Sequence, residues 1–242
     1  MKFYADSAAL ETVTGLLRGG LIAGVTTNPT ILVRDEAPPV AELYRAFAAA
    51  GAAEIFFQTT GATQEQMLDR AERIAGLGPE VIVKVPATPI GFRVAAALRR
   101  QGTPVLMTAV YSVAQAVSAA AVGARYIAPY FGRLSDAGED ASAIMARMVG
   151  ALRGSGTDLL VASVRTPEVI AELAELGVRH ITANPAVLEA AFQDPVSDTA
   201  AAEFEAVARG YDRITHAAGS ETPEGHPAMR SQVRSTGSPV VS

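Results

Sequence analysis

The chain contains no cysteine and no tryptophan, and only three of its 242 residues are histidine. Without cysteine it can form neither a disulfide nor a thiolate nucleophile, and cysteine-ligated metal sites are excluded. His180, His216 and His226 are scattered and lack the spacing of zinc ligands, so we expect no metal and no other cofactor. The absence of cysteine is compatible with the cytoplasm, which is the location we expect.

The sequence also lacks the marks of nucleic-acid-binding and membrane proteins. Its formal net charge is -5 and it has no dense run of Lys and Arg, which argues against a nucleic-acid partner. No apolar run approaches the ~20 residues that span a bilayer. The N-terminal stretch has no signal-peptide core because Asp6 interrupts it. We therefore expect small molecules as partners, with no nucleic acid and no membrane.

What the sequence does have is a repeated alternation of short apolar strands and amphipathic helical stretches. We count eight such units, and this alternation implies a parallel sheet. No GxGxxG motif follows a strand, so a dinucleotide-binding open sheet has no support. The sequence predicts an α/β fold, a (β/α)8 TIM barrel, for which 242 residues is close to the usual length. The predicted strands span 2–6, 24–28, 54–59, 81–85, 104–110, 126–131, 158–163 and 180–183.

One more helix is predicted after the eighth unit. Its apolar residues recur at helical spacing and form a stripe that needs a surface to pack on, either the barrel or a neighbouring subunit. Beyond it the chain turns rich in Gly, Ser, Pro and charge, which is typical of disorder. We predict one domain over 1–217, with the additional C-terminal helix included, and a disordered tail over 218–242. The stripe consists of Phe204, Val207, Ala208, Tyr211 and Ile214.

One predicted strand carries a lysine inside an apolar run, VIVKVP at 81–86. Side chains alternate along a strand, so Lys84 points into whatever Ile82 lines. Burial would lower the pKa of this lysine, and a drop from about 10.4 to about 7 corresponds to roughly 4–5 kcal/mol. A neutral amine can form a Schiff base with a carbonyl. A strand-end lysine can also extend to solvent, so this stretch alone leaves both interpretations open.

Polar side chains stand at the ends of seven predicted strands. The active site of a (β/α)8 barrel lies at the carboxyl ends of its strands. Each polar residue alone could cap a helix or satisfy a loop, but a full set around one lysine indicates a single site at the barrel mouth. His180 begins a strand, at the opposite face, so we expect it to be structural. The strand-end set is Asp6, Thr26, Asn28, Gln58, Lys84, Thr108, Tyr130 and Ser163.

Six motifs then suggest a family: ADS at 5–7, GVTTNPT at 24–30, VKVPAT at 83–88, TAVYSVAQ at 108–115, APYFGR at 128–133 and ASVRTP at 162–167. Together they closely resemble the small-subunit transaldolase family, which includes fructose-6-phosphate aldolase. The resemblance runs from Met1 to about Thr215. It implies a TIM barrel, a metal-free class I mechanism on sugar phosphates, and a homo-oligomer, a pentamer or a decamer.

The resemblance also implies roles for individual residues. Lys84 matches the lysine that forms a Schiff base with the C2 carbonyl of a ketose, so that cleavage of C3–C4 leaves a dihydroxyacetone enamine on the enzyme. Asp6 matches the carboxylate that holds the dihydroxyacetone hydroxyls. Asn28 and Thr26 match positions that contact the same unit, and Thr108 matches a position near the catalytic water.

Three further residues match the phosphate end of the substrate. Arg133 and Ser163 stand at the family's phosphate-binding positions, and Arg165 is a plausible helper. Physical chemistry agrees, because arginine offers a forked, permanently charged donor to a phosphate dianion. Loops after the late strands are also the usual phosphate site in barrels.

Two positions separate the activities within the family. Transaldolases carry Glu on the third strand and Phe on the sixth, whereas this chain has Gln58 and Tyr130, the pattern of the aldolases. The chain departs from the aldolases at Asn184, which bears on substrate fit. We therefore expect a fructose-6-phosphate aldolase. Alternatives are a transaldolase of the pentose phosphate pathway, a Schiff-base aldolase for an aldose phosphate, and a non-catalytic sugar-phosphate-binding barrel.

Overall fold

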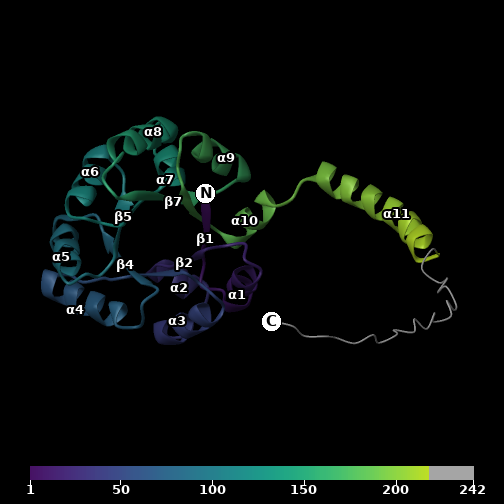
Figure 1. Ribbon diagram of the computed structural model, residues 1–242. Coiled ribbons are helices and arrows are strands. Elements are labelled where there is room, and N and C mark those ends of the chain that lie inside the picture. The colour runs from purple at the N-terminus through teal and green to yellow at the C-terminus, as the bar shows by residue number, and fades with distance from the viewer. Residues whose placement is uncertain (218–242) are drawn as a thin grey trace, which may run out of the picture. The chain divides into compact units, whose positions relative to one another are not determined.

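Runs rich in Val, Ile, Leu and Ala form the strands, as expected for residues that favour a pleated, buried surface. The computed structural model describes residues 1–217, and its eight strands run parallel and close into a barrel in chain order (Figure 1). The predicted (β/α)8 TIM barrel is confirmed. The strands are β1 (Lys2–Asp6), β2 (Gly24–Thr26), β3 (Glu54–Gln58), β4 (Val81–Pro86), β5 (Val105–Val110), β6 (Tyr126–Pro129), β7 (Asp158–Val164) and β8 (His180–Ala183).

A ring of helices surrounds these strands (Figure 1). Several helices begin where a hydroxyl side chain accepts a hydrogen bond from a backbone N–H of the first turn, as Thr88 and Ser112 do. The helices of the barrel are α1 (Leu10–Arg18), α2 (Pro29–Arg34), α3 (Val40–Ala49), α4 (Gln64–Ala75), α5 (Pro89–Arg100), α6 (Val113–Ala121), α7 (Phe131–Asp136), α8 (Ala141–Ala151), α9 (Pro167–Glu175) and α10 (Pro185–Ala191).

Strand alternation divides the apolar side chains between two cores. One face of each strand packs against the ring of helices, and Val81, Val83 and Val85 of β4 belong to this outer core. The other face fills the barrel, where Ile82 packs in a smaller cluster. Lys84 follows Ile82 on the inward face, as the sequence predicts, and lies at the carboxyl end of the barrel interior.

Two short helices, α2 and α7, are absent from the sequence-based prediction. The two strands before them are shorter than predicted: β2 ends at Thr26 rather than at residue 28, and β6 ends at Pro129 rather than at residue 131, so that α7 includes Phe131. Proline has no N–H to give to a strand ladder, so β6 stops there. Tyr130 then makes one isolated bridge to Ala162 and precedes α7. The two site residues Asn28 and Tyr130 thus lie just beyond their strands, each at the start of a helix.

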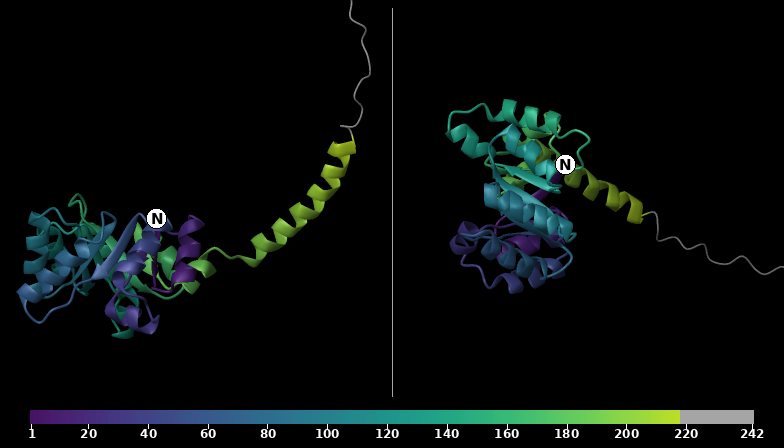
Figure 2. Two further views of the ribbon diagram at one scale, coloured as in Figure 1. Left: turned by 90° about the horizontal axis from the view of Figure 1, so that it is seen from below. Right: turned by 90° about the vertical axis from the view of Figure 1, so that its left-hand side faces the viewer.

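The chain divides after Phe192 into a barrel unit and a second unit that begins at Gln193. The second unit contains α11 (Pro195–Ala217), an unbroken helix seen in Figure 2, so the predicted C-terminal helix is confirmed. The single domain over 1–217 stays a prediction, because the division places α11 outside the barrel unit. Within residues 1–217, no helix is both long and apolar enough to cross a membrane.

The predicted apolar stripe lies along α11. Phe204, Val207 and Tyr211 are exposed by 72%, 73% and 65%. The side chain of Ile214 and the predicted disordered tail over 218–242 lie outside the described residues.

Candidate active site

Lys84 is buried at the carboxyl end of the barrel interior. Only 4% of the residue is exposed, and its strand neighbours are Gln58 on β3 and Leu106 on β5. Burial lowers the pKa of the Lys84 ammonium, and the nearby Asp6 carboxylate opposes this shift in part. Desolvation therefore favours the neutral amine, which is the nucleophilic form.

A chain of hydroxyl groups fixes the Asp6 carboxylate. Thr26 Oγ1 donates to Asp6 Oδ1 at 2.6 Å, and it lies 2.6 Å from the hydroxyl of Thr182 on β8. A threonine hydroxyl has one proton. Because Thr26 gives its proton to Asp6, Thr182 must donate to Thr26. The hydrogen bonds therefore run in one direction, from β8 through β2 to the carboxylate at the end of β1.

Thr108 and Tyr130 form a second hydroxyl pair in the mouth, 2.9 Å apart. Burial is the main cause that raises the pKa of Tyr130; the hydrogen bond with Thr108 acts in the opposite direction, and the charge of Asp6 adds to the rise. The tyrosine thus keeps its proton at neutral pH. A protonated phenol beside a hydroxyl partner can pass a proton to a substrate or a water.

Arg133 lies over the ring of Tyr130, with the guanidinium carbon 4.8 Å from the ring centre. It donates a hydrogen bond of 3.4 Å to the hydroxyl of Tyr111, whose ring stands edge-on to Tyr130 at 5.9 Å. Within residues 1–217 no carboxylate forms an ion pair with Arg133. Its charge is therefore available to an anionic ligand.

The backbone of the mouth departs from regular strand geometry at two places. Ala109 and Ser163 have positive φ, 58° and 60°, which costs energy for residues other than glycine. Both fall where the strand register shifts, at the ends of β5 and β7. Gly132 permits the close approach of α7 to this turn, since a Cβ there would lie 2.6 Å from the carbonyl oxygen of Ser163. The close contact between α7 and the backbone at Ser163, after the register shift in β7, is therefore possible only with glycine at position 132.

Two adjoining hollows open at the mouth, an inner one of about 110 Å³ and an outer one of about 440 Å³. Asp6, Asn28, Tyr130 and Arg133 line both. The inner hollow is also lined by Lys84, Ala162 and Ser163. The outer hollow is also lined by Pro29, Thr30, Ile31, Arg34, Gln58, Pro86, Thr108 and Ala109.

The structure thus gathers eight of the predicted site residues around these hollows and leaves two outside. Thr26 is fully buried behind Asp6 and orients it rather than facing the hollows. Arg165 lines neither hollow, because both ends of its guanidinium are paired with Asp136 at 2.7 and 2.6 Å. Asn184 caps α10 by accepting a hydrogen bond of 3.0 Å from the backbone N–H of Ala186.

Three further residues belong to the site, and the sequence did not indicate them. Thr182 is a polar residue near the carboxyl end of β8. The search for polar residues at strand ends, which identified Asp6, could also have identified Thr182. Arg34 lines the outer hollow from α2, a helix that the sequence did not reveal. Tyr111 follows β5 directly, and nothing in the sequence distinguishes it from a surface loop residue.

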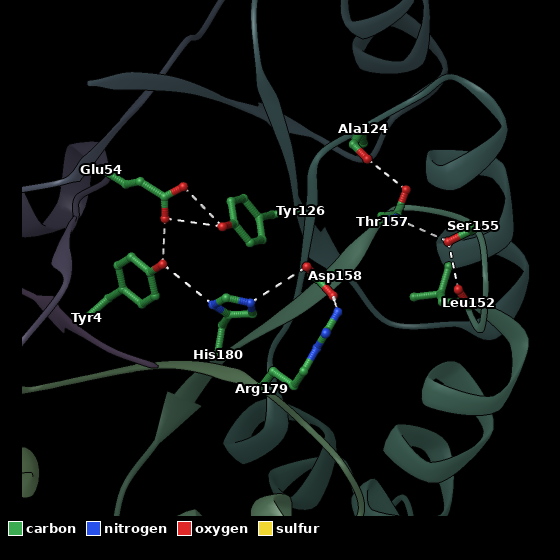
Figure 3. Close-up of polar contacts among 10 residues, drawn as sticks. All are labelled: Tyr4, Glu54, Ala124, Tyr126, Leu152, Ser155, Thr157, Asp158, Arg179 and His180. Atoms are coloured by element: carbon green, nitrogen blue, oxygen red, sulfur yellow. Dashed lines mark hydrogen bonds and ion pairs between the residues drawn. The ribbon is translucent and has the colours of Figure 1, made fainter. Parts of the chain in front are cut away.

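A separate buried cluster closes the other end of the barrel (Figure 3). The carboxylate of Glu54 is buried and accepts hydrogen bonds from the hydroxyls of Tyr4 and Tyr126. His180 lies between the Tyr4 hydroxyl, at 3.5 Å, and the carboxylate of Asp158, at 3.6 Å. Burial lowers the pKa of His180, so the ring favours the neutral form. The structural position expected for His180 agrees with this location at the amino ends of the strands.

The fold and site together define a (β/α)8 barrel with a buried lysine, a carboxylate, a tyrosine and an arginine at its carboxyl-end mouth. In the described part of the chain, no group of three or more His, Cys, Asp or Glu could hold a metal ion.

Comparison with known proteins identifies the family. Residues 3–224 match the family model described as Transaldolase/Fructose-6-phosphate aldolase. A probable transaldolase of Rhodospirillum centenum is 36% identical over 212 residues, which cover 85% of this chain and 90% of that protein. A probable transaldolase of Nitrosopumilus maritimus is 32% identical over 203 residues, covering 81% and 90%. The chain belongs to the transaldolase/fructose-6-phosphate aldolase family.

Solved structures of lower similarity support the fold alone. A crystal structure of mandelate oxidase superposes with a TM-score of 0.58 at 17% identity, covering 78% of this chain and 66% of that chain. Likeness at this level reflects the shared barrel and carries no information about chemistry.

Proposed function

We propose that this protein is a class I, Schiff-base aldolase that cleaves fructose 6-phosphate to dihydroxyacetone and glyceraldehyde 3-phosphate, and forms it in reverse. The observation that carries the proposal is the burial of Lys84 in a small hollow that Asp6, Tyr130 and Arg133 also line. A site that only bound sugar phosphates would need the arginine but not a desolvated lysine beside a tyrosine and a carboxylate.

The reaction begins with addition of the neutral Lys84 amine to the C2 carbonyl of the open-chain ketose. Loss of water from the carbinolamine gives an iminium ion, which accepts the electron pair of the C3–C4 bond as that bond breaks. The C4 hydroxyl loses its proton and becomes the aldehyde of glyceraldehyde 3-phosphate. The remaining enamine is protonated at C3, and water then hydrolyses the iminium to release dihydroxyacetone and free Lys84.

Tyr130 is placed to move the protons in these steps. Its hydroxyl retains its proton because burial raises its pKa, and its partner Thr108 can hold a water beside it. Gln58, on the outer hollow, can orient the same water through its amide but cannot act as a base. Protonation of the enamine, and hence the release of dihydroxyacetone, thus depends on Tyr130.

The two ends of the substrate would meet different residues. Asp6 and Asn28 would hold the hydroxyls of the dihydroxyacetone unit. The Asn28 side-chain oxygen already accepts from the backbone of Ile31 at 3.0 Å, which leaves its amide N–H groups for the substrate. Arg133 and Ser163 would bind the phosphate. Arg165 can assist only if it leaves its bidentate pair with Asp136.

A transaldolase is the second candidate, and the curated relatives favour it because they are named probable transaldolases. A transaldolase would use the same Lys84 enamine but pass it to an acceptor aldehyde instead of releasing dihydroxyacetone. The activities differ in whether a proton reaches the enamine before an acceptor does. Tyr130 and Gln58 favour the aldolase.

Incubation with fructose 6-phosphate in the absence of any acceptor aldehyde separates the two candidates. The aldolase releases free dihydroxyacetone and glyceraldehyde 3-phosphate in equal amounts over many turnovers. A transaldolase gives no sustained release, but transfers the dihydroxyacetone unit once erythrose 4-phosphate is added. An enzyme that performs only the transfer would overturn the aldolase assignment.

The resemblance to the family also supports a homo-oligomer, a pentamer or a decamer, in the cytoplasm. The exposed apolar residues Phe204, Val207 and Tyr211 on α11 are consistent with packing between subunits. Light scattering coupled to size-exclusion chromatography measures the mass directly. A monomer at micromolar concentration would contradict this proposal.

A further inference from the structure

The carboxylate of Asp35 accepts hydrogen bonds from three residues near the site, Ser7, Ala8 and Arg34. Asp35 Oδ2 accepts from the hydroxyl of Ser7 and from the backbone N–H of Ala8, both at 2.8 Å. The Nε of Arg34 donates to Asp35 Oδ1 at 2.6 Å. The Asp35 side chain is only 10% exposed, so its bonds to Ser7 and Ala8 are partly shielded from water, whereas the Arg34 side chain is 51% exposed. Charge-assisted hydrogen bonds of this kind are roughly twice as strong as neutral ones.

These bonds join two segments that each present a residue to the hollows. Ser7 and Ala8 directly follow Asp6 at the end of β1. Asp35 is the C-cap of α2, and the N-cap of the same helix is Asn28. Since α2 has only six residues, a bond at its last turn also restrains its first.

The sheet by itself does not fix this arrangement. The pairing of β1 with β2 ends at Asp6 and Thr26, and Asn28 lies beyond the last paired residue. In the described part of the chain, Asp35 provides the side-chain bonds that tie the segment after β1 to α2. Thr26 holds the Asp6 carboxylate, and Asp35, which lines neither hollow, ties the segment that follows Asp6 to the helix that begins at Asn28.

The hydrogen bonds that Asp35 accepts persist over the pH range of enzyme activity. The hydrogen bond from Arg34 is the largest cause that lowers the pKa of Asp35, to about 2, and the bonds from Ala8 and Ser7 act in the same direction. The carboxylate therefore stays ionised and bonded above about pH 3. This permanence suits a fixed structural constraint on the site and excludes a pH switch.

We propose that Asp35 is a positioning residue that holds Asp6 and Asn28 in the spacing needed to grip the hydroxyl groups of the ketone donor. The inference rests on the proposed function, in which those two residues bind the dihydroxyacetone unit. A site built to hydrogen-bond a hydroxyl discriminates strongly against an analogue that lacks it. Asp35 thereby determines how well the enzyme distinguishes dihydroxyacetone from hydroxyacetone, which has one hydroxyl fewer.

The test measures the rate at which borohydride traps each ketone on Lys84, in wild type and in Asp35→Ala. We expect the ratio of the dihydroxyacetone rate to the hydroxyacetone rate to fall about tenfold in the variant, the scale of one lost charge-assisted hydrogen bond. Asp69→Asn is the matched control, because it removes an exposed Arg–Asp pair on α4, with Arg73, and should keep the ratio. An equal loss of rate with both ketones would show a merely structural role and overturn the proposal.

A second variant covers the case in which Asp35→Ala does not fold. Ser7→Ala removes one of the donors to Asp35 and should shift the ratio in the same direction by a smaller factor. Arg34→Met keeps the bonds to Ser7 and Ala8; if it alone reproduces the full change in ratio, the charge of Arg34 is responsible and the proposal is wrong. Failure of the proposed function looks different: wild type would form no adduct at Lys84 with either ketone, and the inference would fall with it.

Discussion

The hydroxyl oxygens of Thr108 and Tyr130 lie 2.9 Å apart across the mouth of the barrel, one on β5 and the other just beyond β6. The pair shares its hollow with Gln58, while Lys84 lies in the adjoining inner hollow that Tyr130 also lines. In the proposed mechanism, a proton donor that borders both hollows would serve both the enamine carbon and the water that hydrolyses the iminium. This relationship leads to the first prediction.

Tyr130→Phe should lower the cleavage of fructose 6-phosphate about 10²-fold or more, the scale of a lost general acid–base group. Transfer to erythrose 4-phosphate should fall less, because an acceptor aldehyde captures the enamine without prior protonation. Steady-state rates of both reactions on one preparation give the comparison. Cleavage at the wild-type rate would remove Tyr130 from the mechanism.

Arg133→Ala should raise KM for glyceraldehyde 3-phosphate roughly ten- to a hundredfold and leave KM for glyceraldehyde nearly unchanged. A charge-assisted phosphate contact is worth about 1.5–3 kcal/mol, and Arg133 has no competing carboxylate in the described part of the chain. Arg165→Ala is the control and should change KM much less, because Arg165 is paired with Asp136. Similar effects from the two variants would contradict the placement of the phosphate.

Lys84→Met should stabilise the protein while abolishing activity. The pKa of Lys84 is lowered in the folded state, so between that pKa and the unfolded value of about 10.4 the unfolded chain binds more protons, and stability rises with pH. The variant should gain about 1–2 kcal/mol at neutral pH, or a few degrees in Tm.

The sign of the pH dependence provides a further check on the buried lysine. The advantage of Lys84→Met should be largest below the folded pKa of Lys84 and should shrink as the pH approaches about 10. Thermal unfolding at about pH 6 and about pH 9 measures it. An advantage that grows with pH would mean that Lys84 is more easily charged in the fold than in the unfolded chain.

Glu54→Gln should lower the free energy of unfolding by at least about 2 kcal/mol. The buried carboxylate accepts hydrogen bonds from two tyrosine hydroxyls (Figure 3), and it also pairs with Arg125. The cluster lies at the amino ends of the strands, so the folded variant should keep its cleavage rate. Glu80→Gln, which loses a bond from Tyr44 at the surface, serves as the control. A lost rate with unchanged stability would show that the cluster acts on the mouth.

The sequence predicted the barrel because hydrophobic periodicity and strand count are local properties. The inward orientation of the Lys84 side chain followed from the alternation of side chains along one strand. The carboxyl ends of parallel strands meet at one face of a barrel, and this rule predicted a common location for Asp6, Gln58, Tyr130 and Ser163. Each of these inferences needs only neighbours along the chain or the symmetry of the fold.

The features that the sequence did not predict depend on contacts between distant segments. Arg165 was expected to help bind the phosphate, yet its guanidinium is paired with Asp136, which lies 29 residues away in the sequence. Thr26 was expected to touch substrate and instead relays a hydrogen bond from Thr182 to Asp6. Asp35 reads in the sequence as an ordinary loop acid, and only the fold brings it to Ser7. Hydrogen bonds between residues that are distant in the sequence leave no periodic pattern in it, so they could not be predicted.

The most direct test of the mechanism is reduction with borohydride in the presence of dihydroxyacetone, followed by mass spectrometry of the peptides. The buried Lys84 should acquire one dihydroxyacetone-derived adduct, activity should be lost in proportion, and Lys84→Met should acquire none. An adduct on another lysine, or full inactivation without any adduct at Lys84, would contradict the Schiff-base mechanism.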